Sequence, residues 1–260
     1  MGIRYPQLVR VAAAAVCAGL LGVGVAGAEP PTPGGPTPPA EAPVDGPENL
    51  DGLTVHVRPD GGYLTGVTVE FDRSSRTASG EKPAAAQQFV FLFDRSVRIN
   101  AERFPTCARA VLAARGPAGC PSGSQVGAGA AEIYPDRAAE VLVFNTRYEN
   151  GDRGVLITIP ATGGILENTL EPVSDGYRAD YGVAFDELLP SPLPAGQRPA
   201  TTRFRVTFGA TYTDHTGTHS YLESFALPGT PLKFGLWSHF VTGQIIEPTA
   251  YAPRPLSPLG

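Results

Sequence analysis

The sequence predicts an all-β fold, an antiparallel β-sandwich of about eleven strands with one short, disulfide-stapled helix. From residue 53 onward, apolar residues alternate with polar ones, which is the period of a strand with one buried face. Turn dipeptides separate these runs, with Asn150-Gly151 as the strongest and Asp175-Gly176 as a second. β-Branched and aromatic residues fill the runs. A sandwich fits this hairpin spacing best, and a closed barrel is the second choice.

Residues 1–28 have the order of a secretory signal peptide. Arg4 and Arg10 supply the positive start, an uncharged apolar stretch follows, and Ala26-Gly27-Ala28 provides the small residues before a cleavage site. The apolar run is shorter than the roughly 20 residues that span a bilayer, which favours cleavage over a retained anchor. Lipid attachment at Cys17 is disfavoured because a valine precedes it and the apolar run continues past it. We therefore predict export, with no transmembrane segment left after cleavage.

Three further segments follow the signal peptide. Residues 29–48 contain P-P-T-P-G-G-P-T-P-P, a composition that favours an extended, partly polyproline-II spacer. Residues 49–247 carry the strand signals and form the predicted sandwich domain, whereas residues 248–260 return to proline and are predicted to be a tail. A domain of this size buries roughly 70% of its unfolded surface, so it needs no metal to fold.

The strands are expected where the apolar alternation is clearest. Residues 88–93 and 141–144 are apolar on both faces, which predicts central strands that are covered on both sides. Pro59-Asp60-Gly61-Gly62 has the composition of a hairpin turn between the first two strands. The predicted strands are 53–58, 63–71, 88–93, 124–133, 139–148, 154–159, 164–173, 177–185, 202–213, 220–225 and 233–241.

The clearest helix signal covers Cys107–Arg115, which is rich in strong helix formers. Thr106 is suited to cap its start, and Gly116 followed by Pro117 is a stop signal with a left-handed glycine. A helix this short is marginal alone in water because nucleation is costly. We therefore expect a covalent link or tertiary contacts to hold it.

Two cysteines flank this helix, and they become the only two once Cys17 leaves with the signal peptide. A Cys107–Cys120 disulfide closes a loop of about 14 residues and contributes roughly 3 kcal/mol in the chain-entropy model. An exported protein meets an oxidising compartment, which favours this bond. Two reduced thiols and half of a metal site are the alternatives, but metal sites use the much closer C-x₂₋₄-C spacing.

The same stretch carries a composite motif. It reads F-P-x-C at Phe104–Cys107, G-P-x-x-C-P-x-G-S at Gly116–Ser124 and V-G-x-G at Val126–Gly129. The motif resembles a recurring pattern in exported, β-rich proteins of high-GC Gram-positive bacteria. The resemblance implies export and a β-rich fold, and it implies no activity and no catalytic residue.

Charge and motif content exclude several classes of protein. The formal net charge of −5 becomes −7 when Arg4 and Arg10 are removed, and no basic block is present, so we predict no nucleic-acid partner. No G-x-S-x-G nucleophile elbow occurs, and Ser122 and Ser124 are explained by a turn after the disulfide. Two acid pairs have the residue types of a glycosidase, but same-strand acids are typical of a solvated sheet face: Glu70 with Asp72, and Glu167 with Glu171.

Asp214, His215 and His219 are the weak candidates for a metal site, with His239 from a neighbouring strand. A His-x₃-His spacing puts both rings on one face only in a helix, and the residues between these histidines predict a turn. We therefore predict no bound metal and no cofactor.

Tyrosines on the predicted strands suit contacts with carbohydrate or protein, since each has an apolar face and a polar tip. The alternative is that they pack at the rim of the core. We predict a non-catalytic structural or binding module, secreted or associated with the cell envelope, whose partner is an envelope glycan or protein; ligand and oligomeric state stay open. The alternative function is a secreted hydrolase of glycan or ester substrates. The tyrosines are Tyr134, Tyr148, Tyr177, Tyr181, Tyr212 and Tyr221.

Overall fold

The computed structural model describes residues 29–62 and 64–256, and the predicted signal peptide lies outside the described residues. This part of the chain folds into sixteen strands, one α-helix and three short 3₁₀ helices. The helix is α1 (Arg109–Arg115), and the 3₁₀ helices are Ala101–Arg103, Pro117–Gly119 and Ala195–Gln197. The strands are β1 (Leu50–Pro59), β2 (Gly66–Arg76), β3 (Ala86–Asp94), β4 (Val97–Ile99), β5 (Gln125–Ile133), β6 (Arg137–Arg147), β7 (Arg153–Ile159), β8 (Gly164–Pro172), β9 (Tyr181–Leu188), β10 (Thr201–Phe208), β11 (Thr211–Asp214), β12 (Gly217–Ser220), β13 (Leu222–Ser224), β14 (Pro231–Phe240), β15 (Ile245–Ile246) and β16 (Thr249–Pro253).

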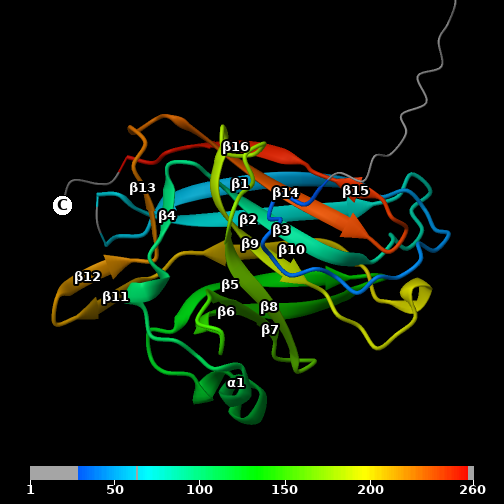
Figure 1. Ribbon diagram of the computed structural model, residues 1–260, viewed down its shortest axis with the longest axis horizontal. Helices are drawn as coiled ribbons and strands as arrows, with labels where there is room; N and C mark the ends of the chain where they lie inside the picture. Colours follow the sequence, from blue (N-terminus) through cyan, green and yellow to red (C-terminus); the bar gives the residue numbers. More distant parts are fainter. Residues whose placement is uncertain (1–28, 63, 257–260) are drawn as a thin grey trace, which may run out of the picture.

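Fourteen of these strands form one antiparallel sheet that wraps around a single core (Figure 1). The order is β15-β14-β3-β9-β8-β7-β6-β5-β10-β2-β13-β4, with β1 paired to β2 and β16 paired to β14. The sheet folds back far enough that β1 lies beside β16. The predicted all-β antiparallel fold with one short helix is therefore confirmed, with more strands than the sequence pattern suggested.

Phenylalanines from opposite layers of the sandwich meet at the centre of the core. The ring of Phe71 on β2 lies 5.4 Å from Phe91 and 5.2 Å from Phe93, both on β3, with the rings close to perpendicular. Strands β2 and β3 are not hydrogen-bonded neighbours, so these rings touch across the core. Edge-to-face pairs of this kind add stability beyond the area they bury.

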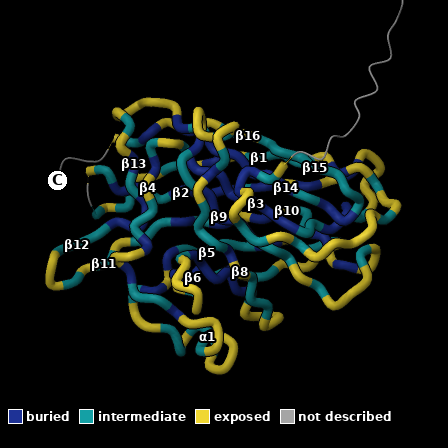
Figure 2. The backbone as a smooth tube through the Cα atoms, viewed as in Figure 1, coloured by how far each residue is buried: buried dark blue, intermediate teal, exposed yellow. Residues whose placement is uncertain are grey.

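Strand β3 is buried on both faces, as its apolar sequence predicts. Phe89, Phe91 and Phe93 point into the core, while Val90 and Leu92 pack on the outer side in a second cluster that contains Trp237. Figure 2 shows the buried backbone concentrated in the central strands, and the exposed backbone in the loops and around α1.

The proline-rich segment 29–48 covers part of the outer face of the sheet. Thr32 is buried, and its Oγ1 donates a 2.6 Å hydrogen bond to Oδ2 of Asp186 on β9. Nε2 of Gln88 donates to the other oxygen of the same carboxylate at 2.7 Å. Gly35 passes so close that a Cβ there would lie 2.5 Å from the Asp186 carboxylate. The segment contains neither helix nor strand, turns at Thr32–Gly35, and packs on the sheet, where the buried Asp186 holds it.

The helix begins two residues later than predicted. Cys107 is extended and pairs with β6, because its N–H donates to the carbonyl of Asn145 and its own carbonyl accepts from Thr146 Oγ1. Ala108 occupies the N-cap position without a side-chain hydrogen bond, so Thr106 is not the cap. The predicted stop is confirmed, because Gly116 ends the helix with a φ of 65°.

The predicted Cys107–Cys120 disulfide is present, with the two Cα atoms 5.1 Å apart. Cys107 is fully buried with Leu112 of α1 against Phe144 and Leu156 of the sheet. The bond therefore fastens the helix to the outer face of β6 and β7.

Replacing Cys107 and Cys120 with serine is expected to lower the free energy of unfolding by about 3 kcal/mol, because the unfolded chain regains the freedom of the closed loop. Urea titration of the oxidised wild type and the double variant measures this difference. Wild-type protein under reducing conditions is the control and is expected to match the variant. Free thiols in the native, unreduced protein would contradict the prediction.

The prediction of one continuous strand over residues 202–213 is wrong, because two strands, β10 and β11, occupy this stretch. It breaks at Gly209, where φ is 143° and a Cβ would lie 2.6 Å from Oγ1 of Thr68. Beyond the break, β11 leaves the main sheet and pairs with β12 in a separate hairpin. At the C-terminal end, β16 pairs with β14 and buries Ala252, so the sheet continues into the segment 248–260 that was predicted as a tail.

Candidate functional site

An irregular loop at residues 189–199 follows β9 and separates two hollows in the protein. Arg198 holds this loop, since its Nη2 pairs with Oε1 of Glu41 at 2.7 Å and its Nε donates to the carbonyl of Leu193. Lys82 donates to the carbonyl of Arg198 at 3.1 Å. The loop is therefore tied both to the N-terminal segment and to the chain before β3.

The inner hollow is a cavity of about 200 Å³ beside this loop, where the two layers of the sandwich end. Most of its wall is apolar and comes from both layers. Glu187 is the acid among its lining residues, and Thr201 adds a hydroxyl. The main apolar lining residues are Phe89, Ala131, Ile133, Ile159, Leu166 and Phe204.

Glu187 points into the core because of its place on β9. Phe185, two residues earlier, is a core residue, and alternate residues of a strand share a face. Glu187 is 1% exposed and its Oε2 has no hydrogen-bond partner in the described part of the protein. Burial raises the pKa of Glu187 to about 8; the amide of Asn168 opposes this rise, and the charge of Asp186 adds to it. The carboxyl group is therefore protonated at neutral pH.

Asn168 lies directly across from Glu187, on β8. It is fully buried, and neither polar atom of its side chain has a partner at normal hydrogen-bond geometry in the described residues. The cavity wall thus contains the Glu187 carboxyl, and the buried amide of Asn168 lies beside it, behind the wall; Oε2 of the carboxyl and both polar atoms of the amide lack hydrogen-bond partners in the described residues. Buried polar groups without partners are costly, and they are a common mark of a site that a ligand completes.

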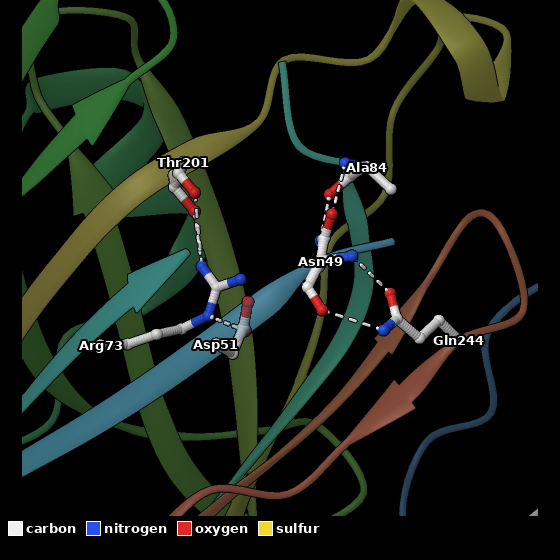
Figure 3. A network of polar contacts seen from close by, with 6 residues as sticks. All are labelled: Asn49, Asp51, Arg73, Ala84, Thr201 and Gln244. Carbon is white, nitrogen blue, oxygen red and sulfur yellow. Dashed lines mark hydrogen bonds and ion pairs between the residues drawn. The ribbon is translucent and has the colours of Figure 1, made fainter. Parts of the chain in front are cut away.

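A buried arginine, Arg73, also faces the core, and Figure 3 shows its polar contacts. Its Nε pairs with Oδ2 of Asp51 at 2.7 Å, and its Nη1 donates to Oγ1 of Thr201 at 3.1 Å. The guanidinium lies over the ring of Phe89 at 4.8 Å. Burial lowers the pKa of Arg73, and the charge and hydrogen bond of Asp51 counteract this effect.

The outer hollow is a groove of about 450 Å³ on the opposite side of the loop. Residues 36–39 form one side of it, and β8 forms the floor with Ile165 and Thr169. At its rim, Nε of Arg109 pairs with Oε1 of Glu167 at 2.7 Å. Strands β8 and β9 lie between the groove and the inner cavity, because Glu167 and Leu188 line the groove whereas Leu166 and Glu187 line the cavity. The two hollows share four lining residues of the loop: Leu189, Pro190, Ser191 and Arg198.

The weak metal candidates do not form one cluster. Asp214 Oδ1 accepts hydrogen bonds from the backbone and side chain of Thr216 and lies 3.3 Å from Nε2 of His219. The side-chain hydrogen bond of Thr216 is the main reason that the pKa of Asp214 is lowered. His215 is exposed in the hairpin turn, and His239 is on β14, away from this hairpin (Figure 1). The described residues contain no group of three His, Cys, Asp or Glu placed to hold a metal.

Acids that could take part in glycosidase chemistry either form ion pairs with arginines or point away from one another. Asp72 pairs with Arg203 at 2.8 Å, and Glu167 pairs with Arg109. Asp186 and Glu187 are adjacent but lie on opposite faces of β9. None of these arrangements places two carboxyls on either side of one substrate bond.

Ser124 is buried, and its Oγ donates to the carbonyl of Pro121 at 2.6 Å. This contact fits the turn that the sequence predicts after the disulfide.

The six tyrosines that the sequence singled out do not gather on an exposed face. Tyr181 and Tyr221 are buried and the other four are half-buried. Tyr148 and Tyr177 use their hydroxyls internally, on the carbonyl of Asn168 at 3.0 Å and on Glu247 at 2.9 Å. The tyrosines therefore pack in the core or at its rim, which is the alternative that the sequence left open.

No pattern in the sequence singled out Glu187, Asn168 or Arg73 as site residues. Glu187 had a local signal, because it continues the inward alternation of Val183 and Phe185. An acid at such an inward position either lies in solvent at the end of a strand or is buried in the core. The sequence alone does not distinguish these two cases.

The chain matches no family model, no curated protein and no solved structure. Within residues 29–62 and 64–256, no helix has the length and apolar character needed to cross a membrane.

Proposed function

We propose that the chain is an exported, non-catalytic β-domain that binds a small molecule in the inner cavity and the outer groove. The observation that carries this proposal is the pair of hollows that adjoin at the loop 189–199, one of them lined by the buried carboxyl of Glu187, whose Oε2 has no hydrogen-bond partner in the described residues. Ligand sites are typically concave and mostly apolar, with a few polar groups that fix orientation. The groove falls within the usual size range of such sites, and the cavity adjoins it at the loop.

Export rests on the order of residues 1–28 and on the motif around the cysteines, and the disulfide supports it. Disulfides persist in oxidising compartments and are rare in the cytosol. The protein then acts outside the cell or in its envelope, where a ligand-binding domain meets small molecules, glycans or other proteins.

The non-catalytic part of the proposal rests on the placement of the titratable groups. Catalysis by acids or histidines needs several such groups facing one substrate. The cavity offers the single carboxyl of Glu187, and Asp186 faces the other side of the sheet. This arrangement suits recognition of a ligand better than proton transfer between two groups.

N-Phenyl-1-naphthylamine, an uncharged dye that fluoresces in apolar surroundings, is expected to bind the protein saturably at one site. Thr169→Trp, which fills the floor of the groove, is expected to weaken this binding at least tenfold. Thr213→Trp is the matched control, because Thr213 is exposed on the hairpin β11–β12, and it is expected to bind as the wild type does. Fluorescence titration measures all three proteins.

A panel of ester and glycoside substrates tests the alternative, a secreted hydrolase. Turnover that one point mutation abolishes in a folded protein would overturn the proposal. Linear, unsaturable dye uptake that Thr169→Trp leaves unchanged would overturn it as well.

A further inference from the structure

We propose that the inner cavity takes an uncharged, largely apolar molecule, one of whose oxygens accepts a hydrogen bond from the Glu187 carboxyl. This inference rests on the proposed function, since it names the ligand class for the same site.

The cavity wall sets the apolar part of the ligand. Apart from Glu187 on β9 and Thr201 on β10, whose hydroxyl accepts a hydrogen bond from Arg73, the strand residues in this wall are alanine, isoleucine, leucine and phenylalanine. Phe89 lies directly across from Glu187 on β3, so the carboxyl is enclosed by apolar surface on that side. A molecule that reaches the carboxyl must therefore bury an apolar body of its own.

The carboxyl sets the polar part. Oε2 of Glu187 is buried and makes no hydrogen bond within the described residues, although the cavity reaches this side chain. A protonated carboxyl has one O–H to donate, and an alcohol, ketone, ester or ether oxygen is a matching acceptor. Such an oxygen satisfies a group that the fold leaves unsatisfied, which favours this ligand over a pure hydrocarbon.

The surrounding charges leave Glu187 without a counter-ion. Arg73 is paired with Asp51, and Arg198 with Glu41, so both nearby cations are already neutralised. Asn168, which faces Glu187 from β8, is uncharged, and the negative charge of Asp186 on the opposite face of β9 adds to the tendency of Glu187 to stay protonated.

The phenol of Tyr148 has its pKa raised mainly by burial, so it carries no charge at neutral pH. The site therefore meets a ligand as a neutral donor.

Charged ligands fit this environment poorly. An anionic ligand would lose its hydration against an apolar wall without gaining a free cation. A cationic amine would require Glu187 to ionise, which forms a buried ion pair whose desolvation offsets its attraction. The groove outside the loop, with Arg109 and Glu167 at its rim, gives a polar end of a longer molecule a place in contact with solvent.

Displacement of N-phenyl-1-naphthylamine by three eight-carbon probes tests the inference: 1-octanol, octylamine and octanoate. At pH 6.5 the full mature protein is expected to bind 1-octanol at least tenfold more tightly than either charged probe. In Glu187→Leu the dissociation constant for 1-octanol is expected to rise about tenfold, because the hydrogen bond is lost. In Glu187→Gln, whose amide still donates, the change is expected to stay within about threefold.

The pH dependence of ligand binding shows whether Glu187 acts as a neutral hydrogen-bond donor or as a charged counter-ion. Wild-type affinity for 2-octanone, an eight-carbon ketone whose oxygen can only accept a hydrogen bond, is expected to fall by about tenfold between pH 6.5 and pH 9, as Glu187 ionises and loses its O–H donor. Glu187→Gln is expected to show no such fall. Glu171→Gln, which removes an acid on the neighbouring strand β8, is the control for a general charge effect and is expected to keep the wild-type profile.

Tighter binding of octylamine than of 1-octanol, lost in both Glu187 variants, would overturn the inference in favour of an ion pair. Equal 1-octanol affinity in the wild type and Glu187→Leu would overturn it too, yet leave the proposed function standing if the dye still binds and Thr169→Trp still blocks it. Failure of the dye and all three probes to bind would overturn both.

Discussion

Arg73→Met is expected to lower the free energy of unfolding by about 3–5 kcal/mol, the range found when one partner of a buried ion pair is removed. The side chains of Arg73 and Asp51 are 2% and 0% exposed, and Oδ1 of Asp51 has no other partner in the described residues. Without the guanidinium, a carboxylate stays in the core unpaired. The loss of the stacking contact with Phe89 adds to the cost.

The double variant Arg73→Met with Asp51→Leu separates the pair from its environment. Replacing both charges by apolar side chains of similar size is expected to recover most of the lost stability, because no buried charge remains. Urea titration of the wild type, both single variants and the double variant gives the coupling energy. A double variant as unstable as Arg73→Met alone would show that packing, not charge, explains the loss.

Arg203→Met is the matched control for this experiment. Arg203 pairs with Asp72 on the outer face of the same sheet, where solvent reaches both side chains. Exposed pairs of this kind contribute little, so only a small change in stability is expected. A large effect at this position would argue against burial as the reason for the cost at Arg73.

Hydrogen bonds of Asn49 fix the start of β1, which carries Asp51 of the buried ion pair. Its side chain exchanges hydrogen bonds with the backbone of Ala84, at 3.0 and 2.8 Å, while its own backbone exchanges two more with the side chain of Gln244 (Figure 3). The start of β1 is thus fixed to two distant parts of the chain. Asp51, two residues on, is held in place for Arg73.

Local signals were enough to predict the elements that depend on local chemistry. Strand β3 has apolar residues on both faces, and the Asn150-Gly151 turn joins β6 to β7 as expected. The disulfide also followed from the sequence, because the predicted removal of a signal peptide leaves two cysteines with a short helix between them. In each case the deciding residues lie close together in the sequence, the two cysteines being farthest apart at 13 positions.

Elements that depend on distant neighbours could not be predicted in this way. Nothing in the run 202–213 shows that Thr68 would crowd Gly209 and end β10 there. The short strands β15 and β16 are recognisable only by their pairing with β14. The inner cavity has the same origin, since its wall is assembled from strands that are far apart in the sequence.

Raising the pH from 5 to 9 is expected to lower the stability of the wild-type protein, and Glu187 is expected to account for most of the loss. The pKa of Glu187 is about 8 in the folded protein, against an ordinary value of 4.5, so the folded state keeps a proton that the unfolded state releases. The stabilising contribution is complete below about pH 4.5 and is lost progressively as the pH rises through 8. At about 1.4 kcal/mol for each pH unit, the stability that is lost between about pH 5 and pH 8 is on the order of 4 kcal/mol.

Glu187→Gln keeps the size and the hydrogen-bonding capacity of the side chain but cannot ionise. It is therefore expected to flatten the decline and to be more stable than the wild type at pH 9, as urea titrations at several pH values would show. Asp186→Asn is the control on the other face of β9. The pKa of Asp186 is raised only to about 6, mainly by burial, so this variant should change the profile between about pH 4 and 6 and leave the decline toward pH 8 in place. Parallel profiles for the wild type and Glu187→Gln would mean that Glu187 is ionised in the folded protein, and the neutral donor in the cavity would be lost with it.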